Sequence, residues 1–160
     1  MLEEVFDQVY TKFKLNFYRK IFSRFEEGEI ALTAVETFCV EVIYALGRPT
    51  INQFAHFVQI SQANAAYKVA KLIKKGYITK ERSVQDKREY HLAVTQKYLD
   101  YRGSSYDYVR LVLERARRRF SSEELAQLEE MLRVISDELM QEITLSQGPG
   151  AKARSGGGEA

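Results

Sequence analysis

Most of this chain carries apolar residues at the spacing of an α-helix. In residues 2–25 they recur at intervals of three or four, which predicts one long amphipathic helix. Its apolar stripe consists of Leu2, Phe6, Val9, Phe13, Phe17, Ile21 and Phe25, with Tyr10 and Phe22 beside it. A stripe this wide is usually buried against more than one partner. The acidic, glycine-containing segment 26–29 is expected to end the helix.

A second helix is expected after Thr33. Thr33, followed three residues later by Glu36, has the pattern of a capping box, and Gly47 with the nearby proline marks the end of the helix. Cys39 lies on the apolar stripe of this helix. A buried structural thiol is favoured over a redox sensor, because no neighbouring basic residue in the sequence would lower the pKa of the thiol.

Two shorter helices are expected next. Thr50 is the expected N-cap of a helix over 51–58, and Ser61 is the expected N-cap of a helix that ends at Gly76. Two short helices separated by a tight turn, the second of them basic, are typical of a helix-turn-helix. The pattern therefore favours the second helix as a DNA-recognition helix.

The predicted recognition helix has two distinct sides. The residues expected to be buried are Ala65, Val69, Leu72 and Ile73. Those expected on the opposite side are Ala63, Asn64, Tyr67, Lys71 and Lys74, with Lys68 on its flank. Small side chains keep the front of the helix slim, as a helix needs in order to enter a major groove about 12 Å wide.

A β-hairpin is predicted after the recognition helix. Residues 77–79 and 90–94 are rich in β-branched and aromatic side chains and indicate two strands. The polar segment between them contains Lys87 and Arg88, which would form a basic tip. For His91, in the second strand, a surface or hydrogen-bonded role is favoured over that of a metal ligand.

A long helix is expected from Thr95 to about Phe120. Glycine and serine residues at 103–105 weaken it, so a kink or an irregular turn is predicted there. Four of the five residues at 115–119 are arginines. This run is expected to complement the helix dipole and to pair with acids on another helix, in preference to binding phosphate.

One more helix is expected at the C-terminal side. Ser121 and Glu124 form a second capping-box pattern, and the helix is predicted to extend to 143. Its apolar seam, which is close to a heptad, consists of Leu125, Leu128, Leu132, Ile135, Leu139 and Ile143. The seam would pack within the monomer or against a second chain. Residues 146–160 lack apolar side chains to bury and are expected to be a disordered tail.

The charge of the chain is unevenly distributed. Residues 49–94 hold 8 basic and 3 acidic side chains, a balance of +5, although the net charge of the chain is only +2. Residues 1–48 hold 6 basic and 8 acidic side chains, and residues 95–160 hold 10 and 11. A basic block between near-neutral flanks indicates a local surface for a polyanion. On charge alone, a solvated basic face without a partner is an equal alternative.

Specific residues make the chain resemble the MarR family of bacterial transcription regulators. They are Leu32-Thr33, Ile60-Ser61-Gln62, Leu72 to Ile78, Asp86-Lys87-Arg88 as an Asp-x-Arg wing signature, and Leu92 to Thr95. These motifs cover about residues 32–95, whereas the flanking helices match in placement and length only. Tyr98 departs from the family, because many members have glycine at that position.

The resemblance implies a mainly α-helical fold with a small β-wing. The expected domain covers 1–145, with a winged helix-turn-helix DNA-binding lobe at about 32–95 and dimerisation helices at about 2–25 and 96–145. It implies a homodimer whose first and last two helices interlock, with two recognition helices in successive major grooves. The expected function is sequence-specific binding of double-stranded DNA by a transcription regulator that acts as a repressor. A small apolar or aromatic effector, which the resemblance also implies, would release it.

Ten residues are candidates for contact with DNA. They are Ser61, Gln62, Asn64, Tyr67, Lys68, Lys71, Lys74, Asp86, Lys87 and Arg88. Gln62 and Asn64 can pair with adenine edges, and Tyr67 can meet a thymine methyl group or a phosphate. The four lysines and the start of the recognition helix at Ser61 suit phosphates. By the resemblance, Asp86 would position the wing and Arg88 would enter the minor groove, where a narrow A·T-rich groove favours arginine.

Two other classes of function compete with DNA binding. A winged-helix module that binds another protein is the alternative, but a lysine-rich face offers less apolar area than a protein-binding surface usually does. An enzyme is not expected, because the sequence shows no paired carboxylates at a plausible site, no nucleophile with a base, no phosphate-cradling loop and no metal cluster. No catalytic residue, cofactor or metal site is therefore predicted. The chain has no run of about 18 apolar residues for a membrane span, and its acidic start is unlike a signal peptide, so a cytoplasmic location is expected.

Overall fold

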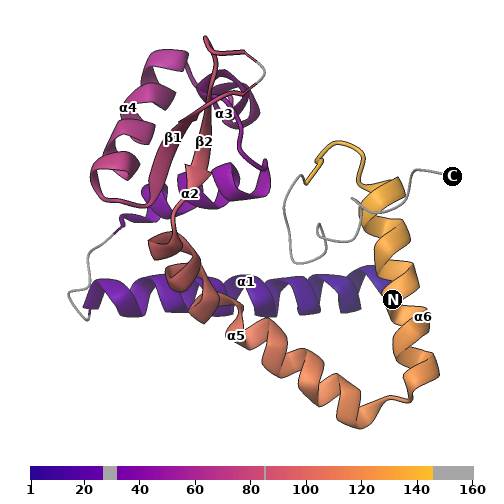
Figure 1. The fold of residues 1–160 in the computed structure, drawn as a ribbon. Helices are drawn as coiled ribbons and strands as arrows, with labels where there is room; N and C mark the ends of the chain where they lie inside the picture. The colour runs from indigo at the N-terminus through magenta and orange to yellow at the C-terminus, as the bar shows by residue number, and fades with distance from the viewer. Residues whose placement is uncertain (27–31, 85, 146–160) are drawn as a thin grey trace, which may run out of the picture. The chain divides into compact units, whose positions relative to one another are not determined.

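The computed structural model describes residues 1–26, 32–84 and 86–145, and its order of elements is shown in Figure 1. The described residues fall into two compact units. The first consists of those in 1–31 and 100–142, and the second of those in 32–99 and 143–160. No described helix is long and apolar enough to cross a membrane. Glu26, the first residue of the predicted break at 26–29, is still helical; the rest of that break and the predicted tail at 146–160 lie outside the described residues.

The second unit contains the helix-turn-helix. Its helices are α2 (Ala34–Ala45), α3 (Ile51–Val58) and α4 (Gln62–Lys74). Their packed faces enclose a core that also receives one residue from each strand of the hairpin and one residue from the start of α5. The largest fully buried side chains are those of Thr37, Val40, Ile43, Phe54, Val69, Leu72, Ile78, Leu92 and Tyr98. The unit is therefore a small three-helix domain closed by a hairpin.

The helices of this unit begin at the predicted N-caps. Thr33 and Glu36 form a reciprocal capping box, Ser61 accepts a hydrogen bond from the first turn of α4, and Thr50 forms a further capping box with Gln53. Gly76 ends the recognition helix with φ +79°. The backbone N–H of Tyr77 donates to the carbonyl of Leu72 at 3.0 Å, and the N–H of Gly76 donates to the carbonyl of Ile73 at 2.9 Å. This is a Schellman motif, which satisfies carbonyls that the helix leaves unpaired.

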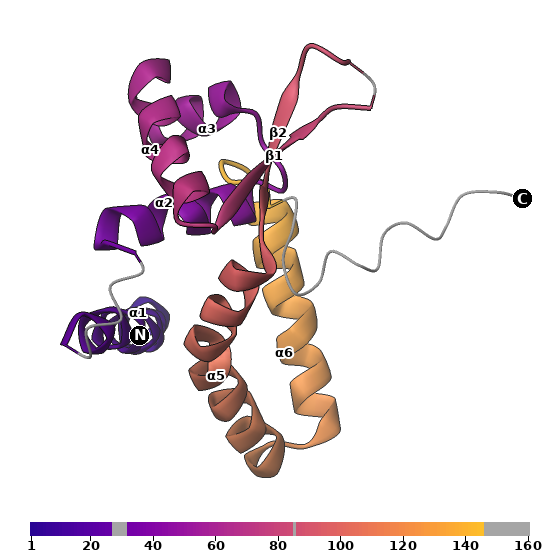
Figure 2. The same cartoon turned by 60° about the vertical axis from the view of Figure 1, so that its left-hand side comes forward.

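The hairpin consists of β1 (Ile78–Arg82) and β2 (Tyr90–Val94), which pair antiparallel. The predicted first strand at 77–79 was therefore misplaced and too short. Polar residues continue the strand because Lys80 to Arg82 lie directly opposite β2, from Leu92 back to Tyr90. Pairing with a partner strand outweighs the weak β-propensity of charged residues. Figure 2 shows the hairpin reaching beyond the helices of its unit.

The first unit is helical. It contains α1 (Leu2–Glu26), most of α5 (Gln96–Arg119), α6 (Ser122–Val134) and a π-helical turn (Ile135–Leu139). Phe13 of α1 meets Tyr108 of α5 edge-on, with ring centroids 5.7 Å apart. The guanidinium of Arg24 donates to the carbonyl of Tyr101 at 3.0 Å and lies 3.8 Å from the centre of the Tyr101 ring. α1 and α5 are therefore joined by aromatic contacts.

Two boundaries in the C-terminal half differ from prediction. The irregular turn expected at 103–105 is not formed, since α5 is helical through these residues. One glycine costs a helix only about 1 kcal/mol relative to alanine, which the flanking turns offset. The helix capped by Ser121 ends at 134, with a π-turn to 139, well before 143. Ile143 and Leu145 instead line a cavity beside Phe57 in the second unit, with 49% and 60% of their surfaces exposed.

Candidate nucleic-acid interface

The recognition helix α4 has the two sides that the sequence predicts. Ala65, Val69 and Leu72 are fully buried, whereas Ile73 is half-buried. The exposed side carries Ala63, Asn64, Tyr67, Lys71 and Lys74. Lys68 is half-buried on the flank of the helix. The helix therefore presents an amide, a phenol and two ammonium groups outward from a firmly packed base.

The start of α4 is held by Ser61. Its hydroxyl accepts the backbone N–H of Asn64 at 3.2 Å, so the hydroxyl oxygen caps the helix. Ser61, Gln62 and Asn64 are all exposed, and the intervening Ala63 adds little bulk. Hydrogen-bonding side chains at a slim, positively polarised helix start suit approach to base edges and phosphates.

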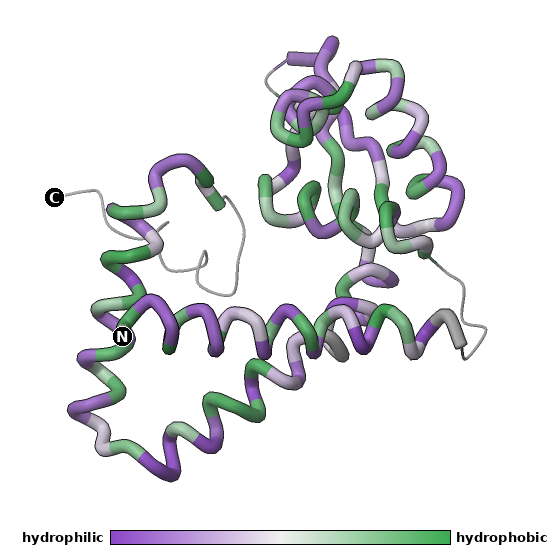
Figure 3. The backbone as a smooth tube through the Cα atoms, turned by 180° about the vertical axis from the view of Figure 1, so that it is seen from behind, coloured by the Kyte–Doolittle hydropathy of each residue, from purple (hydrophilic) through white to green (hydrophobic). Residues whose placement is uncertain are grey.

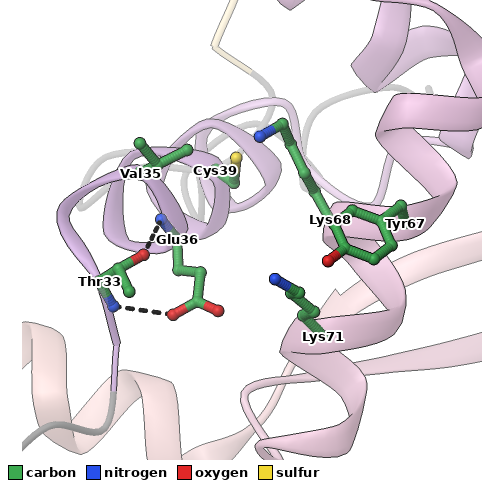
Figure 4. Close-up of a pocket in the computed structure, with 7 residues that line it drawn as sticks. All are labelled: Thr33, Val35, Glu36, Cys39, Tyr67, Lys68 and Lys71. Atoms are coloured by element: carbon green, nitrogen blue, oxygen red, sulfur yellow. Dashed lines mark hydrogen bonds between the residues drawn. The ribbon is translucent and has the colours of Figure 1, made fainter.

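A cavity of about 210 Å³ lies between the start of α2 and the flank of α4. Figure 4 shows Tyr67, Lys68 and Lys71 on one side of it and Glu36 and Cys39 on the other. The Lys71 ammonium lies 4.5 Å from the centre of the Tyr67 ring. Hydrogen bonding to Tyr67 raises the pKa of the exposed Lys71 above its ordinary value. Lys71 and Tyr67 thus form one cationic and aromatic pair.

An ion pair ties the end of α4 to the start of α2. The Lys75 ammonium donates to the Glu36 carboxylate at 2.6 Å, and the same carboxylate accepts the backbone N–H of Thr33 at 2.8 Å. Burial alone would raise the pKa of Glu36, but the hydrogen bonds from Lys75 and Thr33 outweigh it and lower the pKa. The sequence predicted the capping role of Glu36 and missed Lys75, because the two residues lie 39 positions apart.

The wing tip is shaped by Asp86. Its carboxylate accepts the backbone N–H of Arg88 at 2.9 Å, and its own N–H donates to the Ser83 hydroxyl at 3.2 Å. Such a bond from an Asp side chain to the backbone two residues later forms a local turn. The side chains of Lys87 and Arg88 are exposed. The ten candidates therefore form two groups within the second unit, seven on or at the start of α4 and three at the wing tip.

Two basic residues of the wing were missed by the sequence interpretation. Lys80 and Arg82 belong to β1, and their register partners are Leu92 and Tyr90. Alternate strand residues share a face, so both lysine and arginine lie on the face that is buried at Ile78. The Arg82 side chain donates to the carbonyl of Lys87 at 2.5 Å. The recurrence of basic residues at every second position after Ile78 was the available signal, but the predicted strand ended too early to include them.

Cys39 is buried, as predicted, with 8% of its surface exposed. Burial raises the pKa of its thiol, and this effect outweighs the opposing charge of Lys68. The neutral thiol is therefore the dominant form at neutral pH.

A basic second helix exposed on a helix-turn-helix, with a hairpin beside it, defines a winged helix-turn-helix protein. Residues 32–90 match the model of the MarR family, which confirms the resemblance seen in the sequence. This segment matches a MarR-family domain, and it lies within the second compact unit. No curated protein matches the chain.

Solved structures of transcription regulators share the fold. A MarR family protein from Bacillus stearothermophilus superposes with a TM-score of 0.61 at 15% identity, covering 86% of this chain and 92% of that one. The transcriptional regulator Tm0710 from Thermotoga maritima has a TM-score of 0.59 at 17% identity, covering 84% and 90%. FabT from Streptococcus pneumoniae, solved in complex with DNA, has a TM-score of 0.57 at 19% identity, covering 88% and 99%. At these identities the likeness establishes the fold.

Proposed function

We propose that this protein is a homodimeric transcription regulator that binds specific sequences in double-stranded DNA and represses the genes beside them. The observation that carries the proposal is the exposed side of α4, where Asn64, Tyr67, Lys71 and Lys74 project from a helix whose other side is fully packed. The DNA complex of FabT, which has the same fold, supports DNA as the partner. The ten candidate residues keep the roles that the sequence suggested. The proposed location is the cytoplasm, where the double-stranded DNA that such a regulator binds is found.

Arg88 provides the direct test of the wing. Arg88→Ala is expected to weaken binding to a selected operator by about 1–3 kcal/mol, the scale of one specific contact. Lys12→Ala removes an equal charge from an exposed position on α1 and serves as the matched control. Fluorescence anisotropy with genomic fragments enriched by the purified protein measures both. Equal affinity of Arg88→Ala and wild type, with the fold intact, would contradict the wing assignment.

Salt dependence tests the lysines. Each phosphate that a lysine neutralises releases counterions, so the logarithm of the binding constant is expected to fall linearly with the logarithm of salt concentration. Removing Lys74 is expected to reduce the slope by about one, with a similar loss for every sequence. If the wild-type protein binds no double-stranded DNA at low salt, the remaining interpretation is a winged-helix module that binds another protein.

Exposed apolar residues of the first unit support the homodimer. Those of α1 include Leu2, Val5, Phe6, Val9, Tyr10, Leu15, Tyr18 and Phe22. Those of α6 and its π-turn are Leu128, Met131, Leu132 and Leu139. Figure 3 shows the apolar positions spread along both helices. Soluble monomers rarely leave this much apolar surface in water, and a second copy is the partner that every such chain has available.

Sedimentation analysis tests the dimer. Leu132→Asp places a charge on the apolar seam of α6 and is expected to produce monomers that bind DNA weakly. Gln127→Asp adds the same charge at an exposed polar position of the same helix and is the control. A wild-type protein that sediments as a monomer at micromolar concentration would refute this part of the proposal.

A small apolar or aromatic effector is the last part of the proposal. The second unit supports it with an apolar cavity of about 260 Å³ whose lining includes Val42, Ala45 and Phe57. Small aromatic compounds are expected to lower DNA affinity, and Ala45→Leu, which fills part of the cavity, is expected to remove their effect while DNA binding persists. An unchanged response in Ala45→Leu would place the effector elsewhere.

A further inference from the structure

We infer that Arg48 is a positioning residue that fixes the wing against the helix-turn-helix, so that the wing tip is set at a defined distance from the recognition helix. This inference rests on the proposed function, because the position of the wing matters for binding DNA. Arg48 itself lies in the turn between α2 and α3, outside the ten candidate residues.

The backbone of this turn is unusual. Gly47 and Arg48 both have left-handed conformations, with φ of 65° and 61°. Glycine adopts this conformation readily, whereas arginine does so only when the surrounding structure holds it there. Pro49 follows directly and is buried. The turn is therefore held in place by contacts outside itself.

Those contacts come from both strands of the wing. The Arg48 guanidinium forms an ion pair with the Glu81 carboxylate of β1. The Arg48 carbonyl accepts a hydrogen bond from Nδ1 of His91 on β2 at 2.9 Å, and the adjacent Pro49 carbonyl accepts the backbone N–H of Leu92 at 2.8 Å. Glu81 and His91 are direct register partners, so Arg48 contacts both strands at the same position along the hairpin.

These contacts lie close to the tip of the hairpin, so they can set the direction in which the tip points. The pair formed by Glu81 and His91 is followed by one more strand pair, Arg82 with Tyr90, and by a hydrogen bond from the Ser83 N–H to the Glu89 carbonyl at 2.9 Å, beyond which lies the tip that bears Arg88. A hairpin of two strands has little stability of its own, so it depends on contacts with the rest of the domain to keep its direction. Loss of the contacts between Arg48 and the two strands would leave the start of the hairpin packed at Leu92 and allow the tip to move.

Arg48 is exposed and cationic, so direct contact with a DNA phosphate is the competing explanation of any effect on binding. The two explanations predict opposite results for Glu81→Gln. This variant removes the ion pair and makes the protein more positive by one charge. Positioning predicts weaker DNA binding by about three- to tenfold, the scale of coupling between neighbouring residues, whereas phosphate contact predicts equal or tighter binding.

Two further variants separate an effect on the position of the wing from an effect on the stability of the fold. Arg48→Asn removes the guanidinium but keeps a residue that tolerates the left-handed conformation. The exchanged pair, Arg48→Glu with Glu81→Arg, restores an ion pair with reversed direction and is expected to recover most of the affinity. The melting temperature is expected to change little in all of them, because exposed ion pairs contribute little to folding stability.

The decisive measurement is a mutant cycle with the two basic residues of the wing tip. In a background of Lys87→Ala with Arg88→Ala the tip lacks both of its proposed cationic contacts with DNA, so adding Glu81→Gln is expected to cost no further affinity. Additive losses, or tighter binding by Glu81→Gln alone, would overturn the positioning role. Failure of the wild-type protein to bind DNA would instead refute the proposed function, so the two failures are distinguishable.

Discussion

The junction between the start of α2 and the end of α4 depends on one buried carboxylate. Glu36 has 11% of its side chain exposed, whereas its partner Lys75 has 34% exposed. Glu36→Gln keeps the shape of the side chain and an oxygen that can accept the N–H of Thr33, and it removes only the charge. Glu36→Ala removes both interactions. Comparing these two substitutions separates the ion pair from the cap.

The magnitudes follow from the contacts. A hydrogen bond to a charged group contributes about 1.5–3 kcal/mol, and an N-terminal capping interaction contributes about 1 kcal/mol. Lys75 is exposed enough for water to solvate its ammonium after the change, so no buried charge is left. We expect Glu36→Gln to lower the free energy of unfolding by about 1–2 kcal/mol and Glu36→Ala by about 2–4 kcal/mol.

Urea denaturation followed by circular dichroism measures both changes, and its pH dependence isolates the charge. The pKa of Glu36 is lower in the folded chain than in the unfolded chain, so its contribution is complete above the unfolded value of about 4.3 and is lost as the pH falls through the folded value. The difference between wild type and Glu36→Gln is therefore expected to be constant at neutral pH and to shrink in acid.

Glu114→Gln is the matched control, because Glu114 is exposed on α5. Its stability and pH profile are expected to follow those of wild type. The reasoning would be refuted if Glu36→Gln were as stable as wild type, or if the difference between them did not change on acidification. Equal losses for Glu36→Gln and Glu36→Ala would show that the cap contributes nothing.

Three smaller predictions concern other contacts of the second unit. Tyr98→Phe removes a buried hydroxyl that donates to Glu41 at 2.6 Å, and urea denaturation is expected to show a loss of about 1–3 kcal/mol. Gly76→Ala is expected to cost about 1–2 kcal/mol by the same measurement, because φ is +79° there while the added methyl group would meet only Lys97, at 3.9 Å. The Cys39 thiol is expected to react slowly with a disulfide reagent at neutral pH and rapidly in denaturant, because burial raises its pKa and blocks access; rapid reaction of the native protein would contradict its burial.

Features that depend on neighbours within a few residues were predictable from the sequence. Thr33, Thr50, Ser61 and Ser121 begin helices as expected, because a capping bond spans only three residues. The left-handed end of α4 at Gly76 and the division of that helix into a buried and an exposed side were predicted for the same reason. The candidate DNA-binding residues followed from this local pattern and the family motifs.

Features that join distant residues required the tertiary structure. Two sets of contacts connect positions that are 33 to 43 residues apart in the sequence. They are the ion pair of Glu36 with Lys75 and the contacts of Arg48 with Glu81 and His91. The length of β1 was set by the strand opposite it, and the place of Ile143 beside Phe57 depends on packing between elements. Local sequence determines helix starts, turns and faces through short-range hydrogen bonds and periodicity. Which faces meet, and which charges thereby become paired, is decided only when the chain packs, because those energies depend on partners that the local sequence does not contain.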